Sequence, residues 1–381
     1  MYHLAVIGSI LSLAIPTLGL CRCRPHESCW SSFQDWLALN NSIQGQLVSV
    51  RPVAAKCSNV SASWPDPFWR AAEPSAVQWE NWEAWPERNQ TCYIEDRQNT
   101  TCGQGRVSLY PAKVESTSQI QETVAFVKRH NLRLVIKNSG HDFLGRPSAP
   151  ESLQISTHAT KDIENFDKFM PTGAPKDGVG EGPAITIAAG VSITELYAAV
   201  SRHNRSVIAG ASGSIGAGGG YFQGGGHSVF GVWRGLASDN ALESRVVLAE
   251  ASHQAGHLVY ANTFQNTDLF WALRGGGGGS FGIVTSVTLR THPEVPVVVT
   301  NLNITTAGGD PHFWKASPTL NDAGGGGYYL AAPDYPLNET VNVSVMSSVL
   351  IFANATNTTH IDSFYNPLQS KLSQVTGTTA N

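Results

Sequence analysis

The sequence has little charge of either sign and no cluster of basic residues. Only 14% of its 381 residues are charged, the formal net charge is −4, and the pI is near 6.3. No block of Lys and Arg could follow a phosphate backbone, so nucleic acid is not expected as a partner. With 41% hydrophobic residues, the chain can bury one large core or two smaller ones, which predicts a globular protein.

Beyond the first twenty residues, no hydrophobic run is long enough to cross a bilayer. The apolar run at 4–20 contains Pro16 near its end, and the small residues Thr17 and Gly19 precede a possible cleavage after Gly19. This pattern predicts a signal peptide over residues 1–20 and a secreted mature chain without a membrane segment. A membrane anchor is the alternative, because only His3 could supply a positive charge ahead of the run.

Cysteine is absent after residue 102. An even number of cysteines confined to this part of the chain predicts disulfides formed in an oxidising compartment, with a connectivity that sequence does not give. A zinc site is the alternative, but the cysteines lack paired C-x-x-C spacing, and no metal is expected. The six are Cys21, Cys23, Cys29, Cys57, Cys92 and Cys102.

Asn-x-Ser/Thr sequons are unusually frequent and support export with N-glycosylation. The ten are Asn40, Asn59, Asn89, Asn99, Asn204, Asn303, Asn338, Asn342, Asn354 and Asn357.

The composition and the hydrophobic pattern change twice along the chain, which predicts three parts after the signal peptide. Residues 21–104 are rich in Cys and Trp and have little periodicity, which predicts an irregular region that wraps the rest. Residues 105–293 alternate between strand and helix patterns, which predicts an α+β or α/β domain. Residues 294–381 begin a second domain that is small or incomplete.

Within 105–293 the pattern predicts individual elements. One helix is expected to begin at a capping box at Ser118 and another at Ser192-x-x-Glu195. Strands are expected near 107–110, 132–136, 184–189, 242–248 and 283–289.

A small polar loop follows the apolar strand that ends at Ile136. Gly140 and Gly145 permit tight turns that point backbone amides into one concavity, where Asn138, Ser139 and Ser148 add side-chain donors. The loop therefore predicts a phosphate-binding site, although by itself it is equally typical of a surface loop.

A glycine run at 210–228 holds nine glycines in nineteen residues. A flexible linker would be polar throughout, whereas this run contains the apolar anchors Ile215, Tyr221 and Phe222. We expect its glycines to allow the backbone to approach a large planar ligand and its pyrophosphate. A third motif at 268–284 joins a short helix, a second glycine run and a strand.

Neither glycine run fits a nicotinamide or ATP site. A Rossmann site needs G-x-G-x-x-G in the first βα turn with an acidic residue about 20 positions later, and neither run lies in that frame. No G-x-x-x-x-G-K-[ST] motif is present.

Together, over residues 105–293, the motifs resemble the FAD-linked oxidases with an FAD domain of the vanillyl-alcohol oxidase or p-cresol methylhydroxylase type, in their fungal berberine-bridge-like branch. The resemblance implies an FAD-binding domain of that type followed by a partial substrate domain. The motifs that carry it are Ser139-Gly-His-Asp142, the run Gly219–Ser228, Leu236-Ala-Ser-Asp-Asn240, Phe270-Trp-Ala-Leu-Arg-Gly275 and Phe281-Gly-Ile-Val284.

The resemblance also implies the cofactor site. His141 would bond covalently to the flavin, and Ser212, where doubly tethered members have cysteine, implies a single attachment. The cofactor-binding residues implied are Asn138, Ser139, Gly140, His141, Asp142, Phe143, Gly145, Ser148, Ser212, Ser214, Gly216, Gly219, Gly220, Gln223, Gly226, His227, Ile283 and Val284. No general base is identified, and His227 and Tyr221 are equally compatible with packing roles.

By this resemblance the chain is expected to be a secreted FAD-dependent oxidoreductase. It would pass hydride from a small-molecule substrate to FAD, with molecular oxygen as the electron acceptor, in secondary-metabolite tailoring. A carbohydrate oxidase or dehydrogenase is one alternative. A flavin-binding protein with little activity is the other, since the sequence lacks an aromatic-rich C-terminal segment.

Overall fold

The computed structural model describes residues 21–55, 60–95, 102–249, 256–306, 311–336, 342–375 and 377–380. The predicted signal peptide lies outside these residues, as do Cys57 and the sequons at Asn59, Asn99 and Asn338. Within the described ranges, no helix has the length and apolar character needed to cross a membrane.

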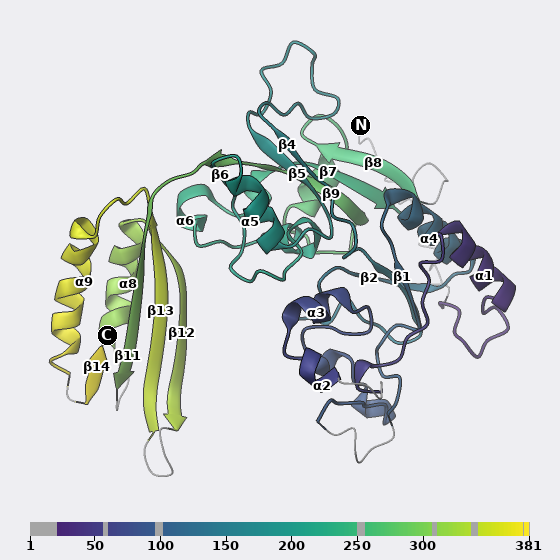
Figure 1. Cartoon of the computed structure of the whole chain (residues 1–381), viewed down its shortest axis with the longest axis horizontal. Helices are drawn as coiled ribbons and strands as arrows, with labels where there is room; N and C mark the ends of the chain where they lie inside the picture. Colours follow the sequence, from purple (N-terminus) through teal and green to yellow (C-terminus); the bar gives the residue numbers. More distant parts are fainter. Residues whose placement is uncertain are drawn as a thin grey trace, which may run out of the picture.

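Short helices joined by irregular chain form the region that precedes the first sheet (Figure 1). They are α1 (Phe33–Ser42), α2 (Val60–Ser63) and α3 (Pro67–Ala72). Ser32 and Asp35 form a capping box at the start of α1, whose Trp36 and Leu39 are buried. The low periodicity of this region therefore reflects short helices that rely on packing against the rest of the chain.

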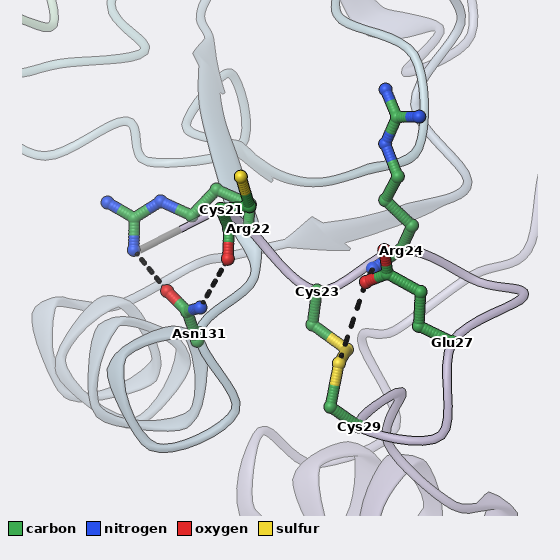
Figure 2. Close-up of a disulfide and its surroundings, with 7 residues drawn as sticks. All are labelled: Cys21, Arg22, Cys23, Arg24, Glu27, Cys29 and Asn131. Atoms are coloured by element: carbon green, nitrogen blue, oxygen red, sulfur yellow. Dashed lines mark hydrogen bonds between the residues drawn. A yellow bond between two sulfur atoms is a disulfide. The ribbon is translucent and has the colours of Figure 1, made fainter. Parts of the chain in front are cut away.

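Two disulfides cross-link this region, Cys23–Cys29 and Cys92–Cys102. Cys21 is exposed and has no disulfide partner among the described cysteines, which do not include Cys57. Figure 2 shows the first of them beside Glu27. Cys23, Glu27 and Cys29 lie within metal-ligand reach of one another, but the two sulfurs are bonded to each other and offer no thiolate. The Asn131 side chain donates to the carbonyl of Cys21 at 2.8 Å, which ties this segment to the exposed turn at residue 131.

A parallel three-stranded sheet comes next, in the order β1 (Tyr110–Lys113), β3 (Ser152–Ser156) and β2 (Arg133–Lys137). Helix α4 (Thr117–Arg129) packs on it through Ile120, Val124 and Val127. The strand expected at 107–110 was misplaced, because the chain still turns at residue 107, where the amide bonds to the carbonyl of Gln104.

The predicted cap of α4 was also misplaced. The cap is Ser116, whose hydroxyl accepts from the amide of Gln119, and not Ser118. The Gln119 side chain accepts in return from the amide of Glu115, at 2.7 Å. Gln121, the partner predicted for Ser118, donates instead to the carbonyl of Gly256.

A five-stranded antiparallel sheet follows, in the order β4-β5-β9-β7-β8. Its strands are β4 (Ile163–Phe166), β5 (Ala184–Ala188), β7 (Ala241–Leu248), β8 (His257–Asn262) and β9 (Ile283–Arg290). The helices beside it are α5 (Ile193–Ser201), α6 (Gly231–Arg234) and α7 (Thr267–Leu273). The predicted capping box of Ser192 and Glu195 at α5 is confirmed. One parallel sheet and one antiparallel sheet confirm the α+β class.

After the short pair β6 (Arg205–Ser206) and β10 (His292–Pro293), the chain forms what we call the C-terminal layer, residues 297–380. Its antiparallel sheet has the order β12 (Gly325–Pro336), β13 (Asn342–Ala353), β11 (Val297–Thr306) and β14 (Thr378–Ala380). Helices α8 (Pro311–Asp322) and α9 (Thr359–Leu372) cover one face of this sheet, as Figure 1 shows.

Strand β12 lies against the segment that follows the first glycine run. A Cβ on Gly326 would stand 1.9 Å from the carbonyl oxygen of Val229, so this close approach needs glycine. The Tyr328 hydroxyl lies 2.9 Å from Nδ1 of His227. The C-terminal layer therefore contacts the segment that carries the glycine motif.

His292, buried at the junction before the C-terminal layer, provides a test of the fold by pH. Its Nε2 donates to the Asn240 side chain at 2.8 Å, and burial, together with Arg234, Arg290 and Arg205, lowers its pKa to about 4. The unfolded side chain takes up its proton near its ordinary pKa of about 6.5, whereas the folded side chain stays neutral down to about pH 4. The contribution of neutral His292 to the free energy of unfolding is therefore complete above about pH 6.5 and is lost as the pH falls toward 4. We expect the free energy of unfolding of His292→Gln to fall less steeply between these pH values, because the variant lacks the side chain that takes up about one proton on unfolding. Melting temperatures measured across this range check it, and an unchanged slope would contradict it.

Candidate functional site

A cavity of about 660 Å³ lies where three sequence motifs meet: the loop after β2, the first glycine run, and the second glycine run with the start of β9. Most of the residues predicted to bind a cofactor line it. They are Asn138, Ser139, Gly140, His141, Asp142, Phe143, Ser148, Gly216, Gly219, Gly220, Gln223, Gly226, His227, Ile283 and Val284. The fold thus gathers segments from across 134–284 into one site.

Three of the predicted residues do not line the cavity. Gly145 lies in the loop but against Trp82, Ser212 is exposed, and Ser214 is buried beneath His141. Other residues line the cavity that were not among the predicted cofactor-binding residues, most of them apolar or glycine; of these, Ile215 and Tyr221 are apolar anchors that the sequence indicated in the glycine run. The further lining residues are Leu134, Val135, Ile136, Arg146, Pro147, Ala149, Thr157, Ala189, Ile215, Tyr221, Gly224, Gly278, Gly279, Ser280 and Gly282.

The loop after β2 is held from behind by the region that precedes the first sheet. The amide of Gln78 donates to the carbonyl of Gly140 at 3.1 Å, and its side chain donates to the carbonyl of Ser139 at 3.0 Å. Gly140 has φ +76°, and a Cβ there would stand 3.1 Å from Cα of Val77. The loop therefore needs glycine both for its backbone conformation and for this contact.

Trp82 supports the outer half of the same loop. Its indole N–H donates to the carbonyl of Phe143 at 3.2 Å, and its ring occupies the space that a Cβ on Gly145 would need, 2.4 Å away. Phe143 itself is 75% exposed at the rim, against the ring of Trp79. The irregular N-terminal region thus shapes one wall of the site.

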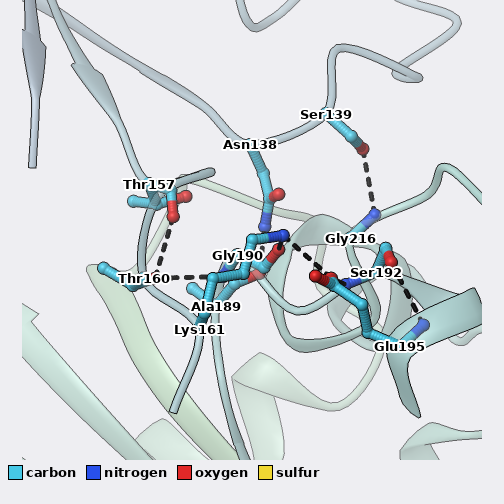
Figure 3. A network of polar contacts seen from close by, with 10 residues as sticks. All are labelled: Asn138, Ser139, Thr157, Thr160, Lys161, Ala189, Gly190, Ser192, Glu195 and Gly216. Atoms are coloured by element: carbon cyan, nitrogen blue, oxygen red, sulfur yellow. Dashed lines mark hydrogen bonds and ion pairs between the residues drawn. The ribbon is translucent and has the colours of Figure 1, made fainter. Parts of the chain in front are cut away.

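The first glycine run packs against Asn138. A Cβ on Gly216 or on Gly219 would come within 2.2 Å of the Asn138 amide group, so both positions exclude a side chain. The Asn138 side chain donates to the carbonyl of Ala189, and the amide of Gly216 donates to Oγ of Ser139 at 3.0 Å (Figure 3).

The network in Figure 3 continues to the start of α5. Lys161 donates to the carbonyl of Gly190 at 2.6 Å and pairs with Glu195 at 2.8 Å, and Glu195 completes the capping box with Ser192. The loop after β2, the glycine run and α5 are therefore braced as one unit.

Two buried side-chain oxygens on the cavity wall lack a hydrogen-bond partner among the described residues. They are Oδ1 of Asn138 and Oε1 of Gln223. Buried acceptors are almost always satisfied, because an unmade hydrogen bond costs about 1–3 kcal/mol. The two oxygens therefore belong to cavity-lining residues and are polar groups whose partners the described residues do not supply.

His141 lies on the cavity wall, half-buried, with its Nε2 2.8 Å from Oγ of Ser214. Burial, with the positive charges of Arg70 and Lys137, lowers its pKa to about 4. The imidazole is therefore neutral at ordinary pH and keeps a lone pair on one ring nitrogen. Nδ1 has no hydrogen-bond partner among the described residues, and it carries the lone pair in the tautomer in which Nε2 donates to Ser214.

A buried lysine lies directly beneath the loop. Lys137, the last residue of β2, is fully buried, and its Nζ donates to the carbonyls of Ala71 at 2.8 Å and Arg70 at 3.2 Å. Burial lowers the pKa of Lys137 to about 7 and raises that of the neighbouring Glu83, which accepts from the amide of Val77, to about 8. A lysine at the end of an apolar strand is the one signal in the sequence that pointed to this buried cation.

The wall beyond the first glycine run is aromatic. The Tyr221 hydroxyl donates to the carbonyl of His227 at 2.7 Å, and its ring fills the space beside Gly210 and Gly226. His227 is exposed and lies edge-on to Tyr328 of β12. This end of the cavity is where the C-terminal layer reaches the site.

Comparison with known proteins agrees with these motifs. Residues 109–254 match the family described as FAD binding domain. The chain is 46% identical over 382 residues to an uncharacterized FAD-linked oxidoreductase of Arthroderma benhamiae, and covers 64% of that protein. It is 42% identical to the FAD-linked oxidoreductase malF of Malbranchea aurantiaca, covering 58%. The alignments include 96% and 85% of this chain.

Solved structures show the same fold. The VAO-type flavoprotein MtVAO713 of Myceliophthora thermophila superposes with a TM-score of 0.78 at 26% identity, over 95% of this chain and 66% of that one. Berberine bridge enzyme of Eschscholzia californica superposes with a TM-score of 0.62 at 15% identity, over 91% of this chain and 60% of that one, and shows the fold alone.

The chain spans about three fifths of the curated relatives it matches. Within that span, the motifs, the family match and the fold agree with one another. The chain carries an FAD-binding domain, has the fold of VAO-type flavoproteins, and is a homologue of the FAD-linked oxidoreductases.

Proposed function

We propose that the chain is an FAD-dependent oxidoreductase that holds its cofactor in the cavity described above. The observation that carries the proposal is the convergence of three glycine-bearing segments on one cavity whose buried oxygens, on Asn138 and Gln223, lack partners. A volume of about 660 Å³ lies within the range of cofactor sites, roughly 300–1,000 Å³.

The residues present fit FAD. The loop after β2 offers backbone amides and the Ser139 hydroxyl for phosphate oxygens, and the glycine run lets a planar ring approach the backbone. The Ser148 hydroxyl, predicted as a further donor, donates instead to the carbonyl of Arg106 at 2.6 Å. When bound, FAD supplies the acceptor for hydride from the substrate. The protein binds and orients the cofactor and shields it from water.

We further propose that His141 carries the flavin covalently. Its neutral imidazole and free Nδ1 suit attack on the 8α carbon, while Ser214 fixes the ring through Nε2. A bond to His141 would replace one imidazole N–H and one C–H of the 8α methyl group, and these two hydrogens would be accounted for as two protons and the electron pair taken up by the flavin. Ser212 offers no second attachment, because a hydroxyl stands where a thiol would be needed.

The division at 293/294 into an FAD-binding domain and a substrate domain stays a proposal. It is supported by the change of sheet after β10 and by the contact of β12 with His227. We propose a small-molecule substrate in secondary-metabolite tailoring, with oxygen as the electron acceptor. Carbohydrate oxidation or dehydrogenation, and flavin binding with little turnover, are the alternatives.

Secretion with N-glycosylation is proposed from the sequence and is compatible with the structure. Both described disulfides suit an oxidising compartment. Six of the seven sequon asparagines in the described ranges are exposed: Asn89, Asn204, Asn303, Asn342, Asn354 and Asn357. Asn40 is half-buried and accepts from the amide of Leu47, so we expect it to be unmodified.

Flavin content is the direct test of the proposed function. We expect the purified chain to be yellow, with about one FAD per polypeptide, and to be bleached by dithionite under anaerobic conditions, because the loop after β2 and both glycine runs line one cavity. Stopped-flow mixing of the reduced protein with oxygen then separates an oxidase, which reoxidises rapidly, from a dehydrogenase. A colourless protein that takes up no FAD on reconstitution would refute the proposal.

A further inference from the structure

The cavity carries a single ion pair on its wall. Arg146 and Asp142 both line it, with side chains 48% and 21% exposed, and no other Lys, Arg, Asp or Glu lines it among the described residues. Nε of Arg146 donates to Oδ2 of Asp142 at 2.7 Å, and Nη2 donates to the same oxygen. The only full charges on the wall thus neutralise each other.

This pairing leaves much of the guanidinium unused. Arginine has five N–H donors, and Asp142 engages only the edge formed by Nε and Nη2. Nη1 has no hydrogen-bond partner in the described parts of the chain. It lies over the backbone of Gly277, where a Cβ would stand 2.9 Å from it. Arg146 therefore reaches from the first loop to the second glycine run.

Asp142 has a second role that does not involve the Arg146 side chain, although its Oδ1 also lies 3.5 Å from the backbone amide of Arg146, which donates to it. Its Oδ1 accepts from the amide of Leu144 at 2.8 Å, which stabilises the turn that follows His141. An asparagine could make the same contact through its own Oδ1. The turn and the ion pair can therefore be tested separately.

The other cations near the loop, Lys137 and Arg70, are already occupied. Arg70 donates to the side chain of Gln78 at 2.9 Å and to the carbonyl of Trp64, and it does not line the cavity. Lys137 is fully buried, does not line the cavity, and donates to the carbonyls of Ala71 and Arg70. A ligand with a diphosphate brings two negative charges into the site, and a planar guanidinium is well suited to phosphate oxygens. Arg146 is the cation available to receive them.

We propose that Arg146 binds the diphosphate of a nucleotide in this cavity by exchanging its partner Asp142 for phosphate oxygens. In this role Asp142 competes with the ligand, and it keeps the guanidinium at the rim in the absence of nucleotide. The proposal rests on the proposed function, since FAD is the diphosphate ligand that the cavity is assigned.

Binding of FAD, ADP and riboflavin to the full chain tests this, because riboflavin lacks phosphate and ADP lacks flavin. The His141→Ala background keeps the cofactor exchangeable, and dissociation constants are measured by calorimetry. Arg146→Gln should weaken FAD and ADP by about ten- to hundredfold, as expected for a lost charge-assisted contact, and leave riboflavin within about twofold. Arg146→Lys should recover part of the lost affinity for FAD and ADP, because lysine keeps the positive charge but lacks the planar guanidinium group.

Asp142→Asn separates phosphate binding from a structural role. If Asp142 competes with the ligand, this variant should bind ADP about two- to fivefold more tightly, as for loss of a partly exposed ion pair. If the pair only holds the loop in shape, Asp142→Asn and Arg146→Gln should weaken all three ligands alike. Arg202→Gln, which removes an exposed arginine outside the cavity, is the matched charge control and should change none of them.

The proposal is overturned if Arg146→Gln leaves ADP binding intact, or if it weakens riboflavin as much as ADP. Failure of the proposed function gives a different result, in which the intact chain contains no flavin and the His141→Ala chain binds none of the three ligands. Binding of riboflavin with loss of only the phosphate-bearing ligands in Arg146→Gln supports both assignments.

Discussion

Replacement of His141 by alanine is expected to release all flavin from the polypeptide. In the native chain, flavin should stay with the protein after acid denaturation, because the neutral imidazole on the cavity wall is the proposed point of attachment. In His141→Ala the cofactor should appear entirely in the supernatant. Fluorescence of the precipitated protein and of the supernatant measures the two fractions, which should go from about one covalent flavin per chain to none.

The neighbours of His141 supply controls for this result. Ser214→Ala removes the hydroxyl that holds Nε2 and should slow attachment, measured as covalent flavin gained over time, without removing the nucleophile. A peptide map of the native protein should show one flavin-bearing peptide, which contains His141. Flavin wholly in the supernatant of the native chain would disprove the covalent bond, and a second flavin peptide with a cysteine would disprove single attachment.

Local patterns in the sequence predicted much of the fold. The Ser192 and Glu195 box, the strand that ends before the loop at Asn138, and the apolar anchor Phe222 in a glycine run are all short-range signals, and each has its expected counterpart. The predicted cap of α4 was wrong because two possible capping boxes, Ser116-x-x-Gln119 and Ser118-x-x-Gln121, overlap in the sequence. A tertiary contact, from Gln121 to the carbonyl of Gly256, decides between the two frames.

The contacts that shape the site could not be predicted in this way. Gln78 and Trp82 support a loop about sixty residues later in the chain, and Tyr328 reaches His227 across a separation of 101 residues. No periodicity or motif encodes such pairs, because they depend on how the folded segments meet. The sequence therefore indicated the three motifs whose residues meet at the cavity, while the parts that hold them in place came from the structure.

The glycines on the cavity wall serve two different purposes, and this distinction gives the second large prediction. At Gly216 and Gly219 an added Cβ collides with Asn138, so a substitution there disturbs the protein itself. Gly220 also lines the cavity, but a Cβ at this position meets no protein atom within 4 Å. A side chain at Gly220 should therefore leave the fold intact and occupy space that the ligand needs.

We expect Gly220→Leu to fold with a melting temperature close to that of the parent chain while losing most of its flavin. Forcing a bulky side chain against a fitted partner costs about 1–3 kcal/mol, which corresponds to roughly ten- to hundredfold in FAD affinity in the His141→Ala background. Gly231→Leu is the matched control, because its Cβ also meets open space and it lies outside the cavity at the start of α6. Gly219→Ala should lower both stability and flavin content.

If Gly220→Leu kept normal flavin affinity, the cofactor would not lie against this part of the glycine run. If Gly231→Leu lost flavin to the same extent, the loss would report damage to the fold, because both side chains are equally bulky and only one faces the proposed site.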